Sequence, residues 1–236
     1  MTTALITGAS RGIGAATARV LAQAGFDLLL VARSGDALEQ LAAELRALGR
    51  RVETAAIDLA DAAGLEAPLL ELCRRGEPPQ LVINNAGVAY TGPLVEMALE
   101  RWQWLLQLNL TSVFQVCRVV VPLLRSGGGG RIINISSHAA RNAFADWGAY
   151  CVSKAALASL SRCLAEEERS NGITVSTLTL GAVNTPLWDS ESVDSSFDRR
   201  AMLDPHRVAE AVLVLAQQPS SQAVDDLTLM PAAGVL

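Results

Sequence analysis

The chain has 236 residues, of which 50% are apolar, 18% charged and 4% aromatic, with a formal net charge of −5. This length is typical of one compact domain, and the acidic balance with scattered arginines disfavours nucleic acid as a partner. The longest apolar runs are interrupted by Asp27, Arg33 and Arg118, so no membrane span is expected. No signal segment opens the chain, which predicts a cytoplasmic protein. None of the four cysteines forms a Cys-x-x-Cys pair and only two histidines are present, so no metal site is expected.

Runs of Val, Ile and Leu alternate with Ala- and Leu-rich stretches of helical period along the whole chain. Strands are predicted at residues 3–7, 27–31, 51–57, 80–84, 130–135, 172–179 and 226–229. Helices are predicted at residues 12–24, 36–48, 62–75, 97–125, 148–170 and 205–217. This alternation predicts an α/β fold: one domain over residues 1–236, with a Rossmann-type, doubly wound parallel sheet of about seven strands and helices on both faces. The polar, non-periodic segment 185–203 is predicted to be a mobile lid over a site.

A glycine-rich turn, ALITGASRGIG, lies between the first predicted strand and helix. Its glycines Gly8, Gly12 and Gly14 would let the backbone approach a pyrophosphate at the helix N-terminus. No Lys-Ser/Thr follows, which argues against a nucleotide triphosphatase. The same letters satisfy G-x-S-x-G, so a serine hydrolase using Ser10 and His206 is an alternative. Only one strand precedes Ser10, whereas a hydrolase elbow follows several strands, and this disfavours the alternative.

Three further motifs lie at predicted strand ends or helix starts. Asn-Asn-Ala-Gly closes the fourth strand and Asn-Ile-Ser-Ser the fifth, at the edge where open α/β sheets bind ligands. Tyr150 and Lys154 are four residues apart and therefore share one face of the following helix. Lys154 is the only lysine among 19 basic residues, which suggests a specific need for an ammonium group there.

Taken together and in this order, TGASRGIG, NNAG, INISS and Tyr-x-x-x-Lys resemble the short-chain dehydrogenase/reductase family over nearly the whole chain. The chain looks especially like the small carbonyl and 3-oxoacyl-carrier-protein reductases. The resemblance implies an enzyme that transfers a hydride between NADPH and a small carbonyl or alcohol substrate. It also implies a homodimer or homotetramer built partly through the helices near 97–125 and 148–170.

The resemblance also implies catalytic roles. Tyr150 would be the general acid/base, Lys154 its activator and ribose anchor, Ser137 the carbonyl-binding hydroxyl, and Asn109 the holder of a water in a proton relay. Ser136 is the alternative to Ser137, which the spacing to Tyr150 favours. Because a phenol with a pKa of about 10 is scarcely ionised at neutral pH, we expect the Lys154 cation to lower the pKa of Tyr150.

Cofactor contacts follow from the same resemblance. They fall on the turn (Gly8, Ser10, Arg11, Gly12, Ile13, Gly14), near the adenine (Asp58, Leu59), along the ribose (Asn85, Ala86, Gly87, with Tyr150 and Lys154) and beside the carboxamide (Val183, Thr185). NADP is preferred over NAD because Ala32-Arg33 stands where an NAD-binding acid would lie. Arg11 would add a second guanidinium for the 2′-phosphate, and Asp36 is expected in the first turn of the next helix.

Some features depart from the family pattern or leave alternatives open. Leu180-Gly181 replaces the usual Pro-Gly, and the ending DDLTLMPAAGVL differs from that of the acyl-carrier-protein reductases, favouring a broader carbonyl reductase. A lone loop histidine is usually a surface residue, which is our interpretation of His138, with substrate contact as the alternative. A catalytically silent dinucleotide-binding regulator remains a further alternative, which the intact Ser137, Tyr150 and Lys154 set disfavours.

Overall fold

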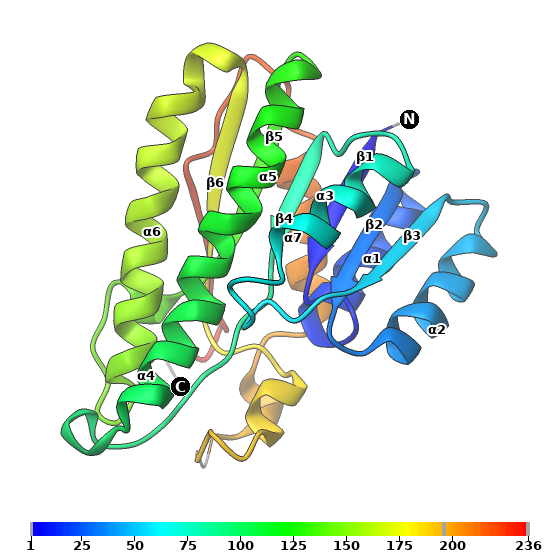
Figure 1. Cartoon of the computed structure of the whole chain (residues 1–236). Coiled ribbons are helices and arrows are strands. Elements are labelled where there is room, and N and C mark those ends of the chain that lie inside the picture. The colour runs from blue at the N-terminus through cyan, green and yellow to red at the C-terminus, as the bar shows by residue number, and fades with distance from the viewer. Residues whose placement is uncertain (1, 195–196, 235–236) are drawn as a thin grey trace.

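The structure is a computed structural model that describes residues 2–194 and 197–234. Its centre is a parallel sheet with the strand order β3-β2-β1-β4-β5-β6-β7 (Figure 1). The strands are β1 (Thr3–Thr7), β2 (Asp27–Ala32), β3 (Val52–Ala56), β4 (Leu81–Asn84), β5 (Gly130–Ser137), β6 (Ile173–Leu180) and β7 (Asp226–Leu229). All seven predicted strands are confirmed, and β5 extends further than predicted, so that the whole INISS motif lies within the strand.

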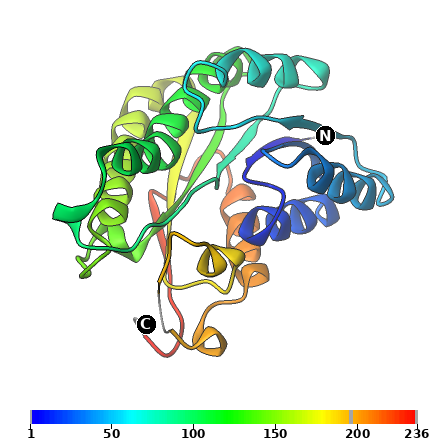
Figure 2. The same cartoon turned by 60° about the horizontal axis from the view of Figure 1, so that its bottom comes forward.

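Helices cover both faces of the sheet (Figure 2). They are α1 (Gly12–Gln23), α2 (Gly35–Arg46), α3 (Glu66–Arg75), α4 (Leu99–Leu106), α5 (Ser112–Ser126), α6 (Gly148–Glu168) and α7 (Pro205–Ala216). One apolar core lies between the sheet and α1, α2 and α7, and the other lies beneath α3, α5 and α6. The doubly wound prediction is therefore confirmed. Since the strand order reverses between β1 and β4, a ligand crevice is expected at their carboxyl ends.

The helix predicted at 97–125 is interrupted rather than regular. A π-helical turn, Gln107–Thr111, separates α4 from α5, and it contains Asn109. The continuous stretch Leu99–Ser126 is the one helix among the described residues that is long and apolar enough to cross a membrane. Of its most apolar window, 61% is buried inside the molecule, where Val113, Val116 and Val120 pack into the core. This stretch is therefore a core helix.

A chain of buried polar side chains fixes α6 against the sheet. Asn84 on β4 donates to Asn134 on β5 at 2.8 Å, and Asn134 donates to the Ser161 hydroxyl of α6 at 2.8 Å. All three residues are almost fully buried. Buried amides are costly when unpaired, so this chain specifies one position of α6 on the sheet. The register of Tyr150 and Lys154 over the strand ends follows from it.

Candidate active site

A cleft with a volume of about 960 Å³ runs along the carboxyl ends of the central strands. Most of the residues singled out from the sequence line it: Gly8, Ser10, Arg11, Gly12, Ile13, Arg33, Leu59, Asn85, Ala86, Gly87, Ser137, Tyr150, Lys154, Val183 and Thr185. Gly14, Asp58 and Asn109 lie outside this lining. The predicted site is thus one continuous surface assembled from segments far apart in the chain.

The glycine turn is tied to the segment that follows β4. Gly8 has φ +65°, and a Cβ there would lie 2.9 Å from Ala86 Cα. Asn85 Nδ2 donates to the Thr7 carbonyl at 2.9 Å, while the Thr7 hydroxyl accepts hydrogen bonds from the backbone N–H groups of Asn85 and Ala86. Only glycine fits this positive φ and close approach, so the two cofactor-binding segments are locked together.

Gly14 and Asp58 have local structural roles in place of a position in the cleft. A Cβ on Gly14 would overlap the Gly8 carbonyl and lie 2.7 Å from Asn85 Nδ2, so its absence lets α1 pack directly on the turn. The carboxylate of Asp58 is exposed and accepts a hydrogen bond from the Ala60 N–H at 2.9 Å. Its neighbour Leu59 is the one that faces the cleft.

Two guanidinium groups lie at the end of the cleft formed by the glycine turn and the end of β2. Arg11 and Arg33 both line it, and within residues 2–194 and 197–234 neither forms an ion pair. Asp36 lies in the first turn of α2, as predicted, and Ser34 caps that helix by accepting from the Ala37 N–H at 3.4 Å. Two cations with no carboxylate partner make this end of the cleft suited to an anion.

Ser137, Tyr150 and Lys154 meet at the wall of the cleft above β5. The Ser137 hydroxyl forms a side-chain hydrogen bond with Tyr150 and also accepts from the Ala139 N–H at 3.1 Å. Lys154 Nζ donates to the Ile135 carbonyl at 2.9 Å and lies 5.7 Å from the centre of the Tyr150 ring. Ser136 also belongs to the cleft lining, but its hydroxyl is buried and has no hydrogen-bond partner among the described residues. The spacing argument for Ser137 thus agrees with the geometry.

Burial dominates the protonation of this group. It raises the pKa of Tyr150 to about 12, against the opposing effect of the Ser137 hydrogen bond. It also lowers the pKa of Lys154 to about 8, because an ammonium withdrawn from water loses its hydration. Desolvation is the largest influence on the pKa of Tyr150, so the net shift is upward, and the lowering that we expect from Lys154 stays a prediction. Tyr150 is a protonated phenol at neutral pH.

Asn109 supports the site from behind. Its Oδ1 accepts from the Val88 N–H at 2.8 Å, and its Nδ2 donates to the Val88 carbonyl at 2.8 Å and to the Ser153 hydroxyl at 3.1 Å. A Cβ on Gly87 would lie 3.3 Å from Asn109 Oδ1 and 3.7 Å from Lys154 Nζ. The amide thus joins the segment after β4 to α6, beside Lys154.

The far end of the cleft combines the segment 185–203, which the sequence predicts to cover a site, with residues that sequence reasoning missed. Phe144, Trp147, Leu187, Trp188, Phe197 and Met230 line it. His138 lines it as well and is half-buried, so both of its interpretations, as a surface residue and as a substrate contact, stay open. Strand β5 runs to Ser137 and delivers His138 directly to the cleft mouth. The few aromatic residues of the chain cluster within residues 144–150 and 188–197, and this clustering could have indicated that they line one site.

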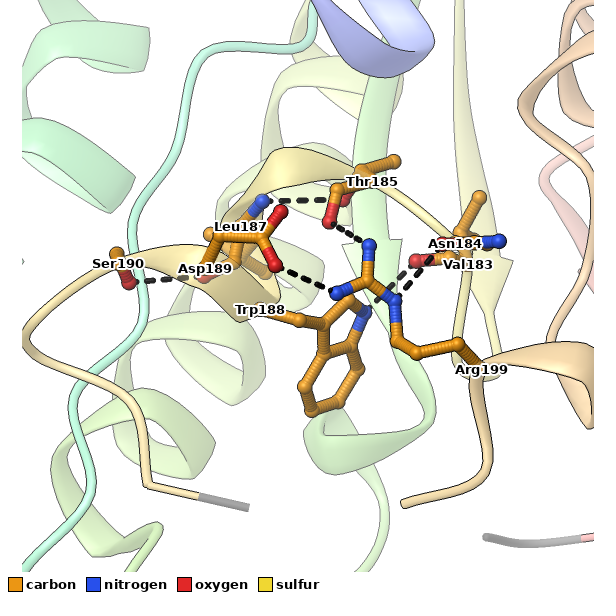
Figure 3. A network of polar contacts seen from close by, with 8 residues as sticks. All are labelled: Val183, Asn184, Thr185, Leu187, Trp188, Asp189, Ser190 and Arg199. Atoms are coloured by element: carbon orange, nitrogen blue, oxygen red, sulfur yellow. Dashed lines mark hydrogen bonds and ion pairs between the residues drawn. The ribbon is translucent and has the colours of Figure 1, made fainter. Parts of the chain in front are cut away.

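Arg199 organises the segment predicted to be a lid, of which residues 195 and 196 lie outside the described part of the chain. Its guanidinium donates to the Thr185 carbonyl, Asn184 Oδ1 and Asp189 Oδ1 at 2.8–2.9 Å, as Figure 3 shows. Trp188 Nε1 donates to the Val183 carbonyl at 2.8 Å in the same network. Ser192 donates to the Ala89 carbonyl at 2.8 Å, which connects the segment to the opposite side of the cleft.

The serine hydrolase alternative requires His206 to act as the general base beside Ser10. His206 lies in the first turn of α7, with its side chain exposed and 3.6 Å from Glu210 of the same helix. It does not line the cleft that contains Ser10. A general base must reach the nucleophile, so the absence of His206 from this lining disfavours the alternative.

Comparisons with known proteins agree with the geometry. The family model for short chain dehydrogenases matches residues 2–195. The chain is 34% identical to the oxidoreductase UcpA of Salmonella typhimurium, over 93% of this chain and 89% of that one. Its structure is similar to that of an alcohol dehydrogenase from the archaeon Thermococcus sibiricus complexed with 5-hydroxy-NADP, with a TM-score of 0.90, 31% identity and coverage of 98% and 97%. It is also similar to L-sorbose reductase from Gluconobacter frateurii complexed with NADPH and L-sorbose, with a TM-score of 0.88, 28% identity and coverage of 98% and 95%.

The chain belongs to the short-chain dehydrogenase/reductase family. It is an NAD(P)-dependent oxidoreductase that transfers a hydride between a nicotinamide cofactor and a carbonyl or alcohol substrate. The resemblance stated from four short motifs is thereby confirmed.

Proposed function

We propose that this protein reduces a ketone or aldehyde with NADPH, using Tyr150 as the proton donor. The observation that carries the proposal is the meeting of Ser137, Tyr150 and Lys154 at the wall of one cleft. Tyr150 carries its proton at neutral pH, as a proton donor in the reductive direction must.

The residues of the cleft fit a dinucleotide. The turn around Gly8 and Gly12 leaves backbone exposed at the N-terminus of α1, where a pyrophosphate is favoured. Asn85, Ala86 and Gly87 would lie along the ribose, with Val183 and Thr185 beside the carboxamide. When bound, the cofactor supplies the hydride.

A preference for NADPH over NADH rests on Arg11 and Arg33. Both guanidinium groups face the cleft beside the end of β2, and the Asp36 carboxylate belongs to α2 and not to the cleft lining. A 2′-phosphate would accept charge-assisted hydrogen bonds there, whereas a bare 2′-hydroxyl would find no carboxylate.

The proton chemistry follows from the positions of three groups. Ser137 holds the carbonyl oxygen of the substrate by donating a hydrogen bond to it, and Tyr150 delivers its proton to the same oxygen as negative charge develops. Lys154 faces the Tyr150 ring from 5.7 Å and favours the phenolate left behind. The amide of Asn109 is committed to Val88 and Ser153, so a water relay at this position would use its backbone carbonyl, which lies in the π-helical turn.

The test is the variant Tyr150→Phe. The matched control is the same substitution at Tyr90, the other tyrosine of the chain. Tyr150→Phe should keep NADPH binding and lower turnover by about 10²-fold or more, the usual scale for losing a general acid. Tyr90→Phe, outside the cleft lining, should retain turnover. Near-normal turnover in Tyr150→Phe would remove Tyr150 from the proposed role, and no NADPH oxidation with any carbonyl compound would favour a silent regulator.

We also propose a cytoplasmic homo-oligomer whose subunits meet through α4, α5 and α6. The exposed apolar side chains Leu99, Phe114 and Val152 on these helices support this surface. Light scattering coupled to gel filtration tests it, and a monomer at micromolar concentration would contradict it. In each subunit, the segment 185–203 would cover the substrate end of the cleft.

A further inference from the structure

Half of the aromatic residues of this chain gather in the cleft. The sequence has four Trp, four Phe and two Tyr, and five of these ten line the cleft: Phe144, Trp147, Tyr150, Trp188 and Phe197. Aromatic residues make up only 4% of the chain, so this grouping is not a reflection of composition. Leu187 and Met230 complete the same end.

The rings form a continuous series that begins at the proposed proton donor. Tyr150 and Trp147 have ring centres 5.6 Å apart, Trp147 and Trp188 5.8 Å, and Trp188 and Phe197 5.5 Å. Their planes are steeply inclined, at 72°, 59° and 87°. Such edge-to-face geometry leaves ring faces and edges available to a further ring at the same spacing.

This wall is held in place before any substrate arrives. The indole of Trp188 donates to the Val183 carbonyl, and the short helix that carries Trp188 is held at both ends by Arg199 through Thr185 and Asp189 (Figure 3). A fixed ring loses little freedom on binding, so its contact with a ligand contributes fully to affinity.

Charge is absent from the aromatic end of the cleft, among the residues described. The charged side chains of the whole lining are Arg11 and Arg33, at the opposite end, and Lys154, which donates to the Ile135 carbonyl. The carboxylate of Asp189 and the guanidinium of Arg199 satisfy each other outside the lining. Beyond Ser137 and Tyr150, which would hold the reacting oxygen, His138 is the remaining titratable group there, and its Nε2 is engaged by Asn142.

A polyhydroxylated or anionic substrate would therefore lose its hydration in this chamber without gaining matched partners. A hydroxyl that is buried without a hydrogen-bond partner is costly in a protein interior. An aryl group instead buries apolar surface against the rings.

We propose that the carbonyl substrates of this enzyme are apolar, ring-bearing ketones or aldehydes, with the ring seated against Trp147, Trp188 and Phe197. The inference rests on the proposed function and specifies its substrate class. The carbonyl lies at Ser137 and Tyr150, and the substituent extends along the aromatic series.

The first experiment uses the unaltered chain with NADPH and four probes: acetophenone, cyclohexyl methyl ketone, phenylglyoxylate and L-sorbose. We expect kcat/KM for acetophenone to exceed kcat/KM for L-sorbose by about 100-fold or more, and kcat/KM for phenylglyoxylate by about 10-fold or more. The reason is that L-sorbose and phenylglyoxylate would bury polar groups without partners. Cyclohexyl methyl ketone should fall a few-fold below acetophenone. L-Sorbose or phenylglyoxylate turned over as well as acetophenone would overturn the inference while leaving the proposed function intact.

The second experiment removes one ring. Trp188→Ala should raise KM for acetophenone by about 10-fold with little change for butanone, since the smaller ketone does not reach the ring. Trp104→Ala, which removes a tryptophan outside the cleft, should change neither. An equal loss for both ketones in Trp188→Ala would assign Trp188 a structural role and contradict the inference. Phe197→Leu, close in volume, repeats the comparison in case Trp188→Ala fails to fold.

A binding measurement separates this inference from the proposed function. If no ketone is reduced, the proposed function fails, but acetophenone should still quench tryptophan fluorescence in the native chain, and should quench it less in Trp188→Ala, where Trp147 remains. L-Sorbose should leave the fluorescence unchanged. Absence of quenching by acetophenone, or equal quenching in Trp188→Ala, would contradict the aromatic site itself.

Discussion

Gly14→Ala provides a sharp test of how the glycine turn is built. Gly14 lies inside α1, where alanine would ordinarily stabilise the helix by up to about 1 kcal/mol. A Cβ at this position, however, would overlap the Gly8 carbonyl and come within 2.7 Å of Asn85 Nδ2. Relieving that overlap must move α1 away from the turn, at the usual overpacking cost of about 1–3 kcal/mol. The steric cost outweighs the helix propensity, so the variant should be less stable by about 1–2 kcal/mol.

The same displacement should weaken the cofactor site, because Gly8 and Asn85 belong to it. The assay is thermal unfolding with and without saturating NADPH. At about 2–4 °C per kcal/mol for a chain of this size, Gly14→Ala should lower the apo melting temperature by several degrees. It should also reduce the additional rise on adding NADPH, which reports cofactor affinity.

Gly35→Ala is the matched control. Gly35 is the first residue of α2, and the nearest atom to a Cβ there is the Ala56 Cβ at 3.7 Å, an ordinary contact. This variant should be neutral or slightly stabilised and should keep the full NADPH response. If Gly14→Ala matched the unaltered chain in both measurements, the packing argument for Gly14 would be refuted.

The remaining predictions concern the charged residues. Arg33→Asp should shift the ratio of catalytic efficiencies toward NADH by about 10-fold or more, because a carboxylate repels the 2′-phosphate and accepts from a 2′-hydroxyl. Lys154→Arg should lower turnover by about 10-fold or more, because the larger, forked guanidinium does not fit the buried position that donates to Ile135. An amine-selective reagent at Lys154 should abolish activity, and bound NADPH should protect against it. Arg199→Lys should raise KM for the carbonyl substrate several-fold with a smaller effect on kcat, because one ammonium cannot replace the three-way contact. Burial lowers the pKa of Lys154 from 10.5 to about 8, so between these pH values the unfolded chain binds more protons than the folded chain. The unaltered chain therefore gains stability as the pH rises from 8 toward 10.5, and Lys154→Met does not. The free energy of unfolding of Lys154→Met minus that of the unaltered chain should be highest at pH 7 and decline from pH 8 toward pH 10.5.

Each of these has a contrary outcome. An efficiency with NADH equal to that with NADPH in the unaltered chain would contradict the assignment of Arg33. Full activity of Lys154→Arg with normal cofactor affinity would leave Tyr150 without its proposed partner. An unchanged KM in Arg199→Lys would show that the network of Figure 3 does not position the substrate wall. A pH-independent stability difference for Lys154→Met would argue against an ammonium desolvated by folding.

Local pattern was sufficient for the elements and for part of the site. Parallel strands buried on both faces appear in the sequence as apolar runs. Motifs at the carboxyl ends of β1, β4 and β5 therefore allowed the glycine turn, the Asn85 segment and Ser137 to be assigned to one edge. Tyr150 and Lys154 share a face because helical geometry puts residues four apart together. These properties depend on neighbours in sequence, and the sequence by itself determined them.

Tertiary packing decided the rest. The pKa of Tyr150 depends on how much water α6 and β5 exclude, which no local motif records. Asn109 accepts a hydrogen bond from the Val88 N–H because the long helix is interrupted by a π-helical turn as it crosses the sheet. Trp147 and Trp188 form one wall, although 41 residues separate them in the sequence, only because α6 and the segment after β6 meet at the cleft. Contacts between distant segments arise from the packing of whole elements, so the sequence indicated that the segment 185–203 covers a site, but only the folded chain showed which residues it meets there.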